Sequence, residues 1–219
     1  MPKVSEEYFE AKKLEIIDAA YRVALRKSIS SMTLMDVREE AGMARGAIYR
    51  YYDSLDEILI ALIAKINQDN SYLEDVRKIF DKQTTLAPEK LLKKLCDFLY
   101  SFLVSREMDV HTLSLQFDIF CIHEPQRVKD MLAKSEEPNN SFSYLLSNLY
   151  EYIRSETKAG RLHPVMPAKK LIDYFFTIYK GIQFQYTLEE KMGTGSYDAK
   201  SAVNAMYKTM LALLGIDIG

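Results

Sequence analysis

Two arginines and a tyrosine lie close together in the segment Arg45-Gly46-Ala47-Ile48-Tyr49-Arg50. A guanidinium group can donate two hydrogen bonds to the edge of a guanine, and a tyrosine hydroxyl can donate one to a phosphate oxygen. These residue types therefore indicate a surface that could contact nucleic acid. The sequence does not reveal which base each side chain would read.

Signals for catalysis or metal binding are weak. The chain has no Gly-x-Ser-x-Gly, phosphate-loop, His-Glu-x-x-His or Cys-x-x-Cys motif. One cluster, Cys121-x-His123-Glu124 with His111 about three helical turns earlier, offers two or three metal ligands without a fourth. We expect no metal, no cofactor and no enzymatic activity. A helical enzyme that uses the region of Cys121 and His123 is an alternative that metal analysis would test.

The charge balance argues mildly against nucleic acid. The 219 residues include 29 Lys and Arg and 31 Asp and Glu, which gives a formal net charge of -2. A protein that holds DNA by bulk electrostatics would normally carry a basic excess, because such affinity comes from counterion release at phosphates. If the chain binds DNA, we expect weak non-specific affinity and a shallow dependence on salt.

The composition predicts an all-α protein, and we place it in the cytoplasm. Gly and Pro are few, and Leu, Ala, Lys, Glu, Met and Ile favour helix. Two cysteines, Cys96 and Cys121, are too few for a disulfide framework. The first residues contain no apolar signal segment, and the longest apolar run, 58–64, is far shorter than the roughly 18 residues of a membrane span. We therefore expect no membrane partner.

The elements that must position the arginines are short helices. Helical periodicity covers residues 8–27, and Thr33 stands where an N-cap would open a second helix that Gly42 ends. A third short helix is expected around residues 47–52, and Ser54-x-x-Glu57 has the form of a capping box before a fourth. Two short helices joined by a tight turn at glycine form the pattern of a helix-turn-helix. Its expected apolar contacts are Val37, Ala41, Met43, Ile48 and Tyr51.

From residue 16 to 59 the sequence resembles the N-terminal domain of the TetR (tetracycline-repressor) family of transcriptional regulators. The resemblance rests on Ile17-x-Ala19-Ala20, Thr33-Leu34-x-Asp36-Val37, Ala41-Gly42, Gly46-x-x-Tyr49-x-x-Tyr52 and Ser54-x-x-Glu57-Ile58. The chain departs from the usual pattern at Ser28, Arg38, Ala44 and Leu55. Leu55 replaces a common phosphate-contacting lysine, so the residues that anchor the DNA backbone are in doubt.

The resemblance implies a DNA-contacting surface. Thr33 and Tyr49 would bond phosphates, Arg45 would reach a base edge or phosphate, and Gly46 would allow close approach to the major groove. Arg38 could supply a substitute phosphate contact. For Tyr51 and Tyr52 the alternative is that their rings pack beneath the next helix. The expected DNA-contacting residues are Thr33, Arg38, Ala44, Arg45, Gly46, Ala47, Tyr49, Arg50 and Tyr51.

The remaining chain reads as longer helices, about nine in all with the first domain. They are expected near 88–102, 110–122, from Pro125 onward, 142–158, 167–188 and 199–214, with a break at 136–140, an end at Gly160 and a loop at 192–196. We place an N-terminal helix-turn-helix DNA-binding domain at 1–53 and a C-terminal ligand-binding and dimerisation domain at 54–219.

Aromatic and a few polar residues of the C-terminal domain could converge on a cavity, although a simple core is the alternative for each. A small lipophilic or aromatic effector would suit such a cavity, and the resemblance implies a ligand domain. The expected pocket residues are Phe98, Phe102, Leu113, Gln116, Phe117, Phe120, Tyr144, Phe176, Tyr179 and Gln183.

Residues 171–186 are apolar nearly all round, so their helix should be buried on two sides. A homodimer through a four-helix bundle of this helix and the last one is the natural solution, and the resemblance implies the same. Two-fold symmetry would place two recognition helices about 34 Å or somewhat more apart, facing a palindrome. The expected interface residues are Ile178, Gly181, Ile182, Gln185, Val203, Met206, Tyr207 and Met210.

These features together predict a transcriptional regulator that binds a double-stranded DNA operator as a homodimer. We expect a repressor that a small lipophilic effector releases from a palindromic operator. The alternative is a helical small-molecule-binding protein with weak or lost DNA binding, which the neutral charge and Leu55 favour.

Overall fold

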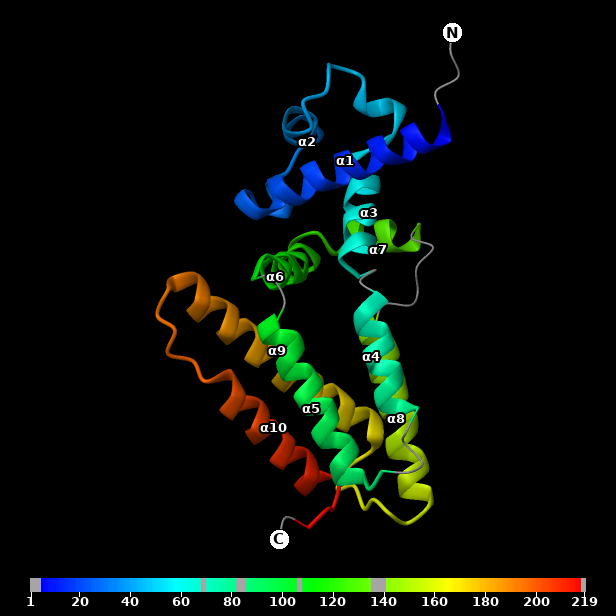
Figure 1. Cartoon of the computed structure of the whole chain (residues 1–219), viewed down its shortest axis with the longest axis vertical. Helices are drawn as coiled ribbons and strands as arrows, with labels where there is room; N and C mark the ends of the chain where they lie inside the picture. The colour runs from blue at the N-terminus through cyan, green and yellow to red at the C-terminus, as the bar shows by residue number, and fades with distance from the viewer. Residues whose placement is uncertain (1–4, 68–69, 82–85, 106–107, 135–140, 218–219) are drawn as a thin grey trace. The chain divides into compact units, whose positions relative to one another are not determined.

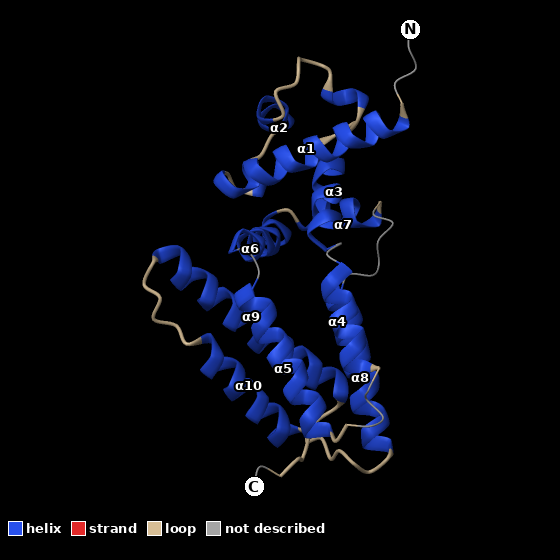
Figure 2. Ribbon diagram, viewed as in Figure 1, coloured by secondary structure: helices blue, strands red, loops and turns tan. Residues whose placement is uncertain are grey.

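The computed structural model describes residues 5–67, 70–81, 86–105, 108–134 and 141–217. These residues form ten α-helices and two short 3₁₀ helices, and none of them is in a strand (Figure 2). The all-α prediction is confirmed. None of the described helices combines the length and the hydropathy needed to cross a bilayer.

The chain divides into two compact units. Residues 1–68 and 112–138 form the first, and residues 69–111 and 139–219 form the second. Each unit is thus built from two separate stretches of sequence. The expected DNA-binding segment 1–53 lies wholly within the first unit, and the functional boundary after residue 53 stays a prediction.

The first unit contains the short elements of the N-terminal region. They are α1 (Glu6–Arg26), η1 (Ile29–Ser31), α2 (Leu34–Glu40), η2 (Ile48–Arg50) and α3 (Leu55–Asn67). Most of α6 (Met108–His123) and all of α7 (Pro125–Ala133) join them. Helix α1 packs on α2 and α3, and α3 packs on α7.

The core of this unit is drawn from both stretches. Ile16, Val37 and Leu59 are fully buried from the first stretch, and Leu113 and Phe120 of α6 are buried in the same cluster. Burying a large apolar side chain contributes about 1.5–3 kcal/mol, so α6 is an integral part of this fold.

The second unit contains α4 (Asn70–Phe80), α5 (Pro88–Ser105), α8 (Ser141–Lys158), α9 (Ala168–Met192) and α10 (Ala199–Leu213). Helix α10 packs along α5 and α9, while α4 lies against α8 and α5 (Figure 1). The backbone N–H of His163 donates to the carbonyl of Leu214 at 2.9 Å and fastens the end of α10 to the loop before α9.

In the second unit several boundaries agree with the expectations, and one helix was not expected. Gly160 follows α8 with φ 73°, as a helix-ending glycine should, and α9 ends at the left-handed Gly193. Helix α4 is not among the expected helices, although its apolar positions make it amphipathic. The expected break at 136–140 lies outside the described residues.

Candidate nucleic-acid interface

Helix α2 begins at a dense hydrogen-bond network. The Thr33 hydroxyl accepts from the backbone N–H of Asp36 at 3.2 Å, which confirms Thr33 as the N-cap. Oδ2 of Asp36 accepts from the Thr33 hydroxyl, the Thr33 N–H and the Lys27 ammonium, each at 2.7 Å. These donors, Lys27 first, lower the pKa of Asp36 to about 2. The Thr33 proton is therefore directed at Asp36, and a phosphate would have to compete for it.

The turn after α2 has the expected glycine. Gly42 has φ 64°, a region that residues with a Cβ rarely occupy, and the N–H of Met43 returns to the carbonyl of Arg38 at 3.1 Å. Val37 and Ile48 are buried on either side of the turn, while Met43 is packed less completely against the same core. The sequence-based packing scheme of the helix-turn-helix thus agrees with the structure here.

The second arm of the motif differs from the expected α-helix. Gly46 has φ 84°, which interrupts helical hydrogen bonding, and residues 45–47 form turns before the single 3₁₀ turn η2. Within it the N–H of Arg50 donates to the carbonyl of Ala47, three residues earlier. The prediction of a regular helix through residues 47–52 is corrected, because the N–H groups of Arg50 and Tyr51 bond carbonyls three residues earlier and the regular part is the single 3₁₀ turn at Ile48–Arg50.

The side chains expected to contact DNA are mostly exposed in this arm. Arg45 and Arg50 are exposed, and Tyr49 keeps 60% of its surface accessible. Ala44 and Gly46 are exposed as well, and Ala47 is half-buried. Neither Arg45 nor Arg50 forms an ion pair with a described residue.

The other cations of the described residues 5–67 are all in ion pairs. Arg22 and Arg26 of α1 both bind Glu40 of α2, at 2.6 and 2.5 Å. Arg38 pairs with Glu39 at 2.8 Å, so a phosphate would have to compete with this acid, and a phosphate contact by Arg38 stays a prediction. The remaining pairs are Lys12 with Glu15, Lys13 with Glu10, Lys27 with Asp36 and Lys65 with Asp18.

The two tyrosines that end the arm have different surroundings. Tyr52 is only 8% exposed, which confirms the packed alternative, and burial raises its pKa to about 12. Tyr51 is half-buried and its ring lies 4.9 Å from that of Phe9. Tyr51 therefore has a packing role, and a phosphate contact by its hydroxyl stays a prediction.

The ten expected pocket residues do not gather in one unit. Leu113, Phe117 and Phe120 belong to the core of the first unit, and Gln116 binds the carbonyl of Ala24 there. The second unit holds Phe98, Phe102, Tyr144, Phe176, Tyr179 and Gln183. The structure thus divides the ten residues between the two units, and a cavity lined by all of them stays a prediction.

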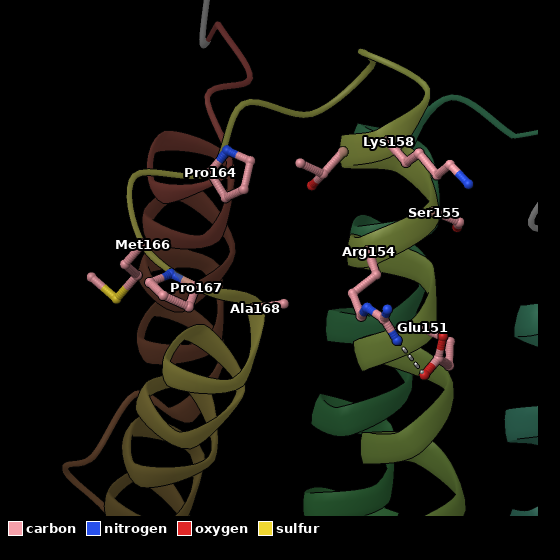
Figure 3. A pocket seen from close by; sticks show the side chains of 9 residues that line it. Glu151, Arg154, Ser155, Lys158, Pro164, Met166, Pro167 and Ala168 are labelled. Atoms are coloured by element: carbon pink, nitrogen blue, oxygen red, sulfur yellow. Dashed lines mark hydrogen bonds and ion pairs between the residues drawn. The ribbon is translucent and has the colours of Figure 1, made fainter.

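The hollows of the second unit include an apolar cavity, a wide groove, and a cleft of about 320 Å³ between α5 and α10. An apolar cavity of about 30 Å³ is lined by leucines, methionines and aromatics that include Phe176 and Tyr179. A wide groove of about 680 Å³ runs between α8 and residues 164–168, with Arg154 and Glu151 on one wall and Pro164 and Pro167 on the other (Figure 3). The first has room for about one water molecule, so it holds no effector-sized volume in this structure.

His111 is bonded inside the second unit. Its Nε2 lies 2.8 Å from the carbonyl of Leu103, and its Nδ1 lies 3.1 Å from the amide nitrogen of Gln183. Cys121 and His123 lie further along the same helix and are exposed. Ten residues of α-helix span about 15 Å, so Cys121 lies about that far from His111 along the axis. Nowhere in the described ranges do three His, Cys, Asp or Glu side chains come together as a metal site.

The expected dimer residues separate into interior and surface groups. Ile182, Val203, Met206 and Met210 are buried in the core of their own unit, so they are not available to a partner without repacking. Ile178, Gln185 and Tyr207 are half-buried, and Gly181 is exposed. Helix α9 also exposes apolar side chains that are absent from the expected interface, namely Tyr174, Phe184, Leu188 and Met192.

The N-terminal segment is similar in sequence to known bacterial regulators. Residues 16–62 match the family model of bacterial regulatory proteins, tetR family. The segment is 39% identical over 62 residues to the uncharacterized HTH-type transcriptional regulator YfiR of Bacillus subtilis (strain 168), covering 28% of this chain and 30% of YfiR. It is 30% identical over 73 residues to the HTH-type transcriptional regulator TtgR of Pseudomonas putida, covering 33% and 35%. The matches thus span about a third of these relatives.

The fold is similar over nearly the whole chain. A putative TetR-family transcriptional regulator from Rhodococcus sp. superposes with a TM-score of 0.67 at 13% identity, covering 93% of this chain and 99% of that one. The regulator FadR from Bacillus subtilis, solved in complex with stearoyl-CoA, gives 0.61 at 16% identity, with 93% and 99% covered. Residues 16–62 thus match the N-terminal domain of the TetR family of transcriptional regulators, and the fold of nearly the whole chain is similar to that of solved regulators of this family.

Proposed function

We propose that the protein is a homodimeric repressor that binds a palindromic DNA operator and is released by a small lipophilic effector. The observation that carries DNA binding is the placement of unpaired positive charge. Arg45 and Arg50 lie exposed on the second arm of the helix-turn-helix beside Tyr49, while the other basic side chains of the described residues 5–67 are in ion pairs.

This placement of charge is how a protein with a formal net charge of -2 could still bind DNA. Ion pairs such as Lys27 with Asp36 contribute little long-range field, because the opposite charges lie within 3 Å. The positive field that a DNA backbone meets therefore comes mainly from Arg45 and Arg50, together with the one positive charge that Glu40 leaves uncompensated on Arg22 and Arg26. With few phosphate contacts per protomer, binding should depend weakly on salt and strongly on the geometry of the dimer.

A homodimer would use the exposed apolar side chains of α9. Tyr174, Phe184, Leu188 and Met192 are exposed along this helix, and no atom lies within 4 Å of the place where a Cβ on Gly181 would stand. A glycine there allows a second helix to approach closely. We propose that α9 of one protomer packs on α9 of its partner through these side chains, with Tyr207 and α10 at the side.

Effector binding in the apolar cavity would require the second unit to open. Its aromatic side chains surround a cavity that is far too small for a drug-sized molecule, so the ligand would stabilise a wider conformation. FadR from Bacillus subtilis, which has the same fold, was solved with stearoyl-CoA, and this supports a lipophilic ligand class. Release from the operator then follows if the wider form disfavours the spacing that the two helix-turn-helix motifs of the dimer need on DNA.

Selection of bound duplexes from a random library tests the proposal. Enrichment of a palindrome, followed by loss of its binding when a lipophilic compound is added, is the expected result. The alternative function, a helical small-molecule-binding protein without DNA binding, predicts no enriched sequence while lipophilic ligands still raise the melting temperature. Enrichment without any compound-dependent release across a broad lipophilic library would reject the effector part alone.

A further inference from the structure

We propose that α6 and α7 position the helix-turn-helix by tethering it at both ends, through Gln116 at its entry and Arg127 at its exit. The entry is the corner between α1 and η1, and the exit is the first turn of α3. The proposal rests on the DNA-binding function proposed above and assigns positioning roles to two residues outside the DNA-contacting arm.

The entry tether is a two-way amide contact. Nε2 of Gln116 donates to the carbonyl of Ala24 at 2.9 Å, and Oε1 accepts from the N–H of Ile29 at 3.1 Å. Ala24 belongs to the last turn of α1, whose final carbonyls have no partner within the helix, and Ile29 begins η1. Gln116 therefore satisfies one backbone group on each side of the break at Lys27 and Ser28 and sets the angle of the corner.

The exit tether is an ion pair held on an aromatic ring. Nε and Nη2 of Arg127 donate to Oδ1 of Asp56 at 2.9 and 2.6 Å, and Nη1 donates to Glu124 at 3.0 Å. The guanidinium lies over the ring of Phe120 at 5.2 Å, and Phe120 is itself buried in the core of the first unit. Asp56 is in the first turn of α3, so the pair fixes where the helix-turn-helix ends.

Between the tethers the chain has few regular elements of its own. Residues 41–47 and 51–54 are turns and loops, and the two 3₁₀ helices have three residues each. The buried side chains Val37 and Ile48 hold the motif together, but they do not fix its ends. Both ends are held by one pair of consecutive helices, so a displacement of α6 and α7 would move the whole reading surface together.

The test uses the full chain and the duplex enriched by the wild-type protein. Gln116→Met removes both amide bonds at similar volume, and Arg127→Met removes the pair with Asp56 while keeping an apolar stem over Phe120. Gln126→Met is a matched control, because Gln126 lies on α7 and bonds only Asp130 among the described residues. All are compared where circular dichroism shows them fully folded.

Each tether variant should weaken binding to the selected duplex by about tenfold and leave binding to random duplex unchanged, because the arginines remain but are misplaced. Arg127→Lys should recover part of the loss. In Gln116→Met the exchange of the Ile29 amide proton should accelerate, while that of Val37 stays slow. The Gln126→Met control should match the wild type in all three measurements.

Two results would overturn the proposal. Selected-duplex affinity within twofold of wild type in both tether variants would show that the tethers are structural only. An unchanged Ile29 exchange rate in Gln116→Met would show that the entry tether does not hold that amide. If wild-type protein enriches no duplex, the proposed function fails, and the exchange measurement still decides whether the tether exists.

Discussion

Replacing Arg45 or Arg50 by methionine should show whether DNA affinity depends on where a positive charge lies or only on the net charge. Either change lowers the positive charge of the first unit by one and leaves its core intact, since both side chains are exposed and form no ion pair with a described residue. Arg26→Met changes the formal charge equally but removes a cation already bound to Glu40. Arg22 still binds Glu40 in that control, so α1 and α2 keep one of their two ion pairs.

The expected magnitude depends on what each arginine contacts. A bidentate contact to guanine is worth about 1–3 kcal/mol, and a two-fold dimer loses it twice, so the loss is about 2–6 kcal/mol or roughly 30-fold to 10⁴-fold. An arginine on phosphate would instead weaken binding to all sequences. In that case the slope of log affinity against log salt would become shallower by about 0.9 per contact, or roughly 1.8 per dimer.

Fluorescence anisotropy with the selected duplex and a random duplex, at several salt concentrations, measures both quantities. The Arg26→Met control should bind within about threefold of wild type, because Arg26 lies on α1 outside the arm at residues 45–50 and shares the Glu40 carboxylate with Arg22. Equal weakening by Arg26→Met, Arg45→Met and Arg50→Met would refute the reasoning, since affinity would then follow net charge. A wild-type salt slope as steep as about -10 would contradict it as well.

The other predictions concern acid stability, the turn and the dimer. Because its folded pKa is lowered, Asp36 contributes stability that is present above about pH 4 and is lost as the pH falls toward 2; Asp36→Asn should cost about 1–2 kcal/mol in urea unfolding at pH 7 and almost nothing at pH 2. Gly46→Ala should destabilise by about 1–2 kcal/mol through its positive φ alone, because no atom lies within 4 Å of the added carbon; an unchanged urea midpoint would argue against the left-handed turn. Phe184→Asp and Leu188→Asp should yield folded monomers in sedimentation velocity, and dimers at wild-type strength would exclude the exposed apolar side chains of α9 as the interface.

Local features of the helix-turn-helix region could be predicted from the sequence. Thr33 caps α2 and Gly42 makes the turn because each acts on backbone groups within a few residues. The capping residue Ser54 is confirmed by its bond to the N–H of Glu57, although the Glu57 carboxylate reaches the N–H of Asp53 instead of that of Ser54. Such signals need no knowledge of the tertiary structure.

Partners of the apolar stripes could not be predicted in the same way. A buried helix face of either unit could have the spacing of Leu113, Phe117 and Phe120. Nothing in that spacing distinguishes the wall of a cavity from the core of the first unit. Similarly, α9 is apolar on two sides, and only the structure shows that Ile182 faces inward while Phe184 faces out. The conformation of residues 45–50 depends on Gly46, because a glycine adopts positive and negative φ with similar ease.

The discontinuous make-up of the first unit has a consequence during synthesis. Residues 1–68 leave the ribosome without Leu113, Phe120 and Met131, which complete their core. At about 5–20 residues per second, the roughly 63 residues from 68 to 131 take about 3–13 s to make. For that interval residues 1–68 expose the apolar surface that α6 and α7 later cover. A chaperone could bind this surface, or the nascent chains could aggregate through it. The DNA-binding end of the chain is thus made first but is completed only after more than half of the protein has been translated.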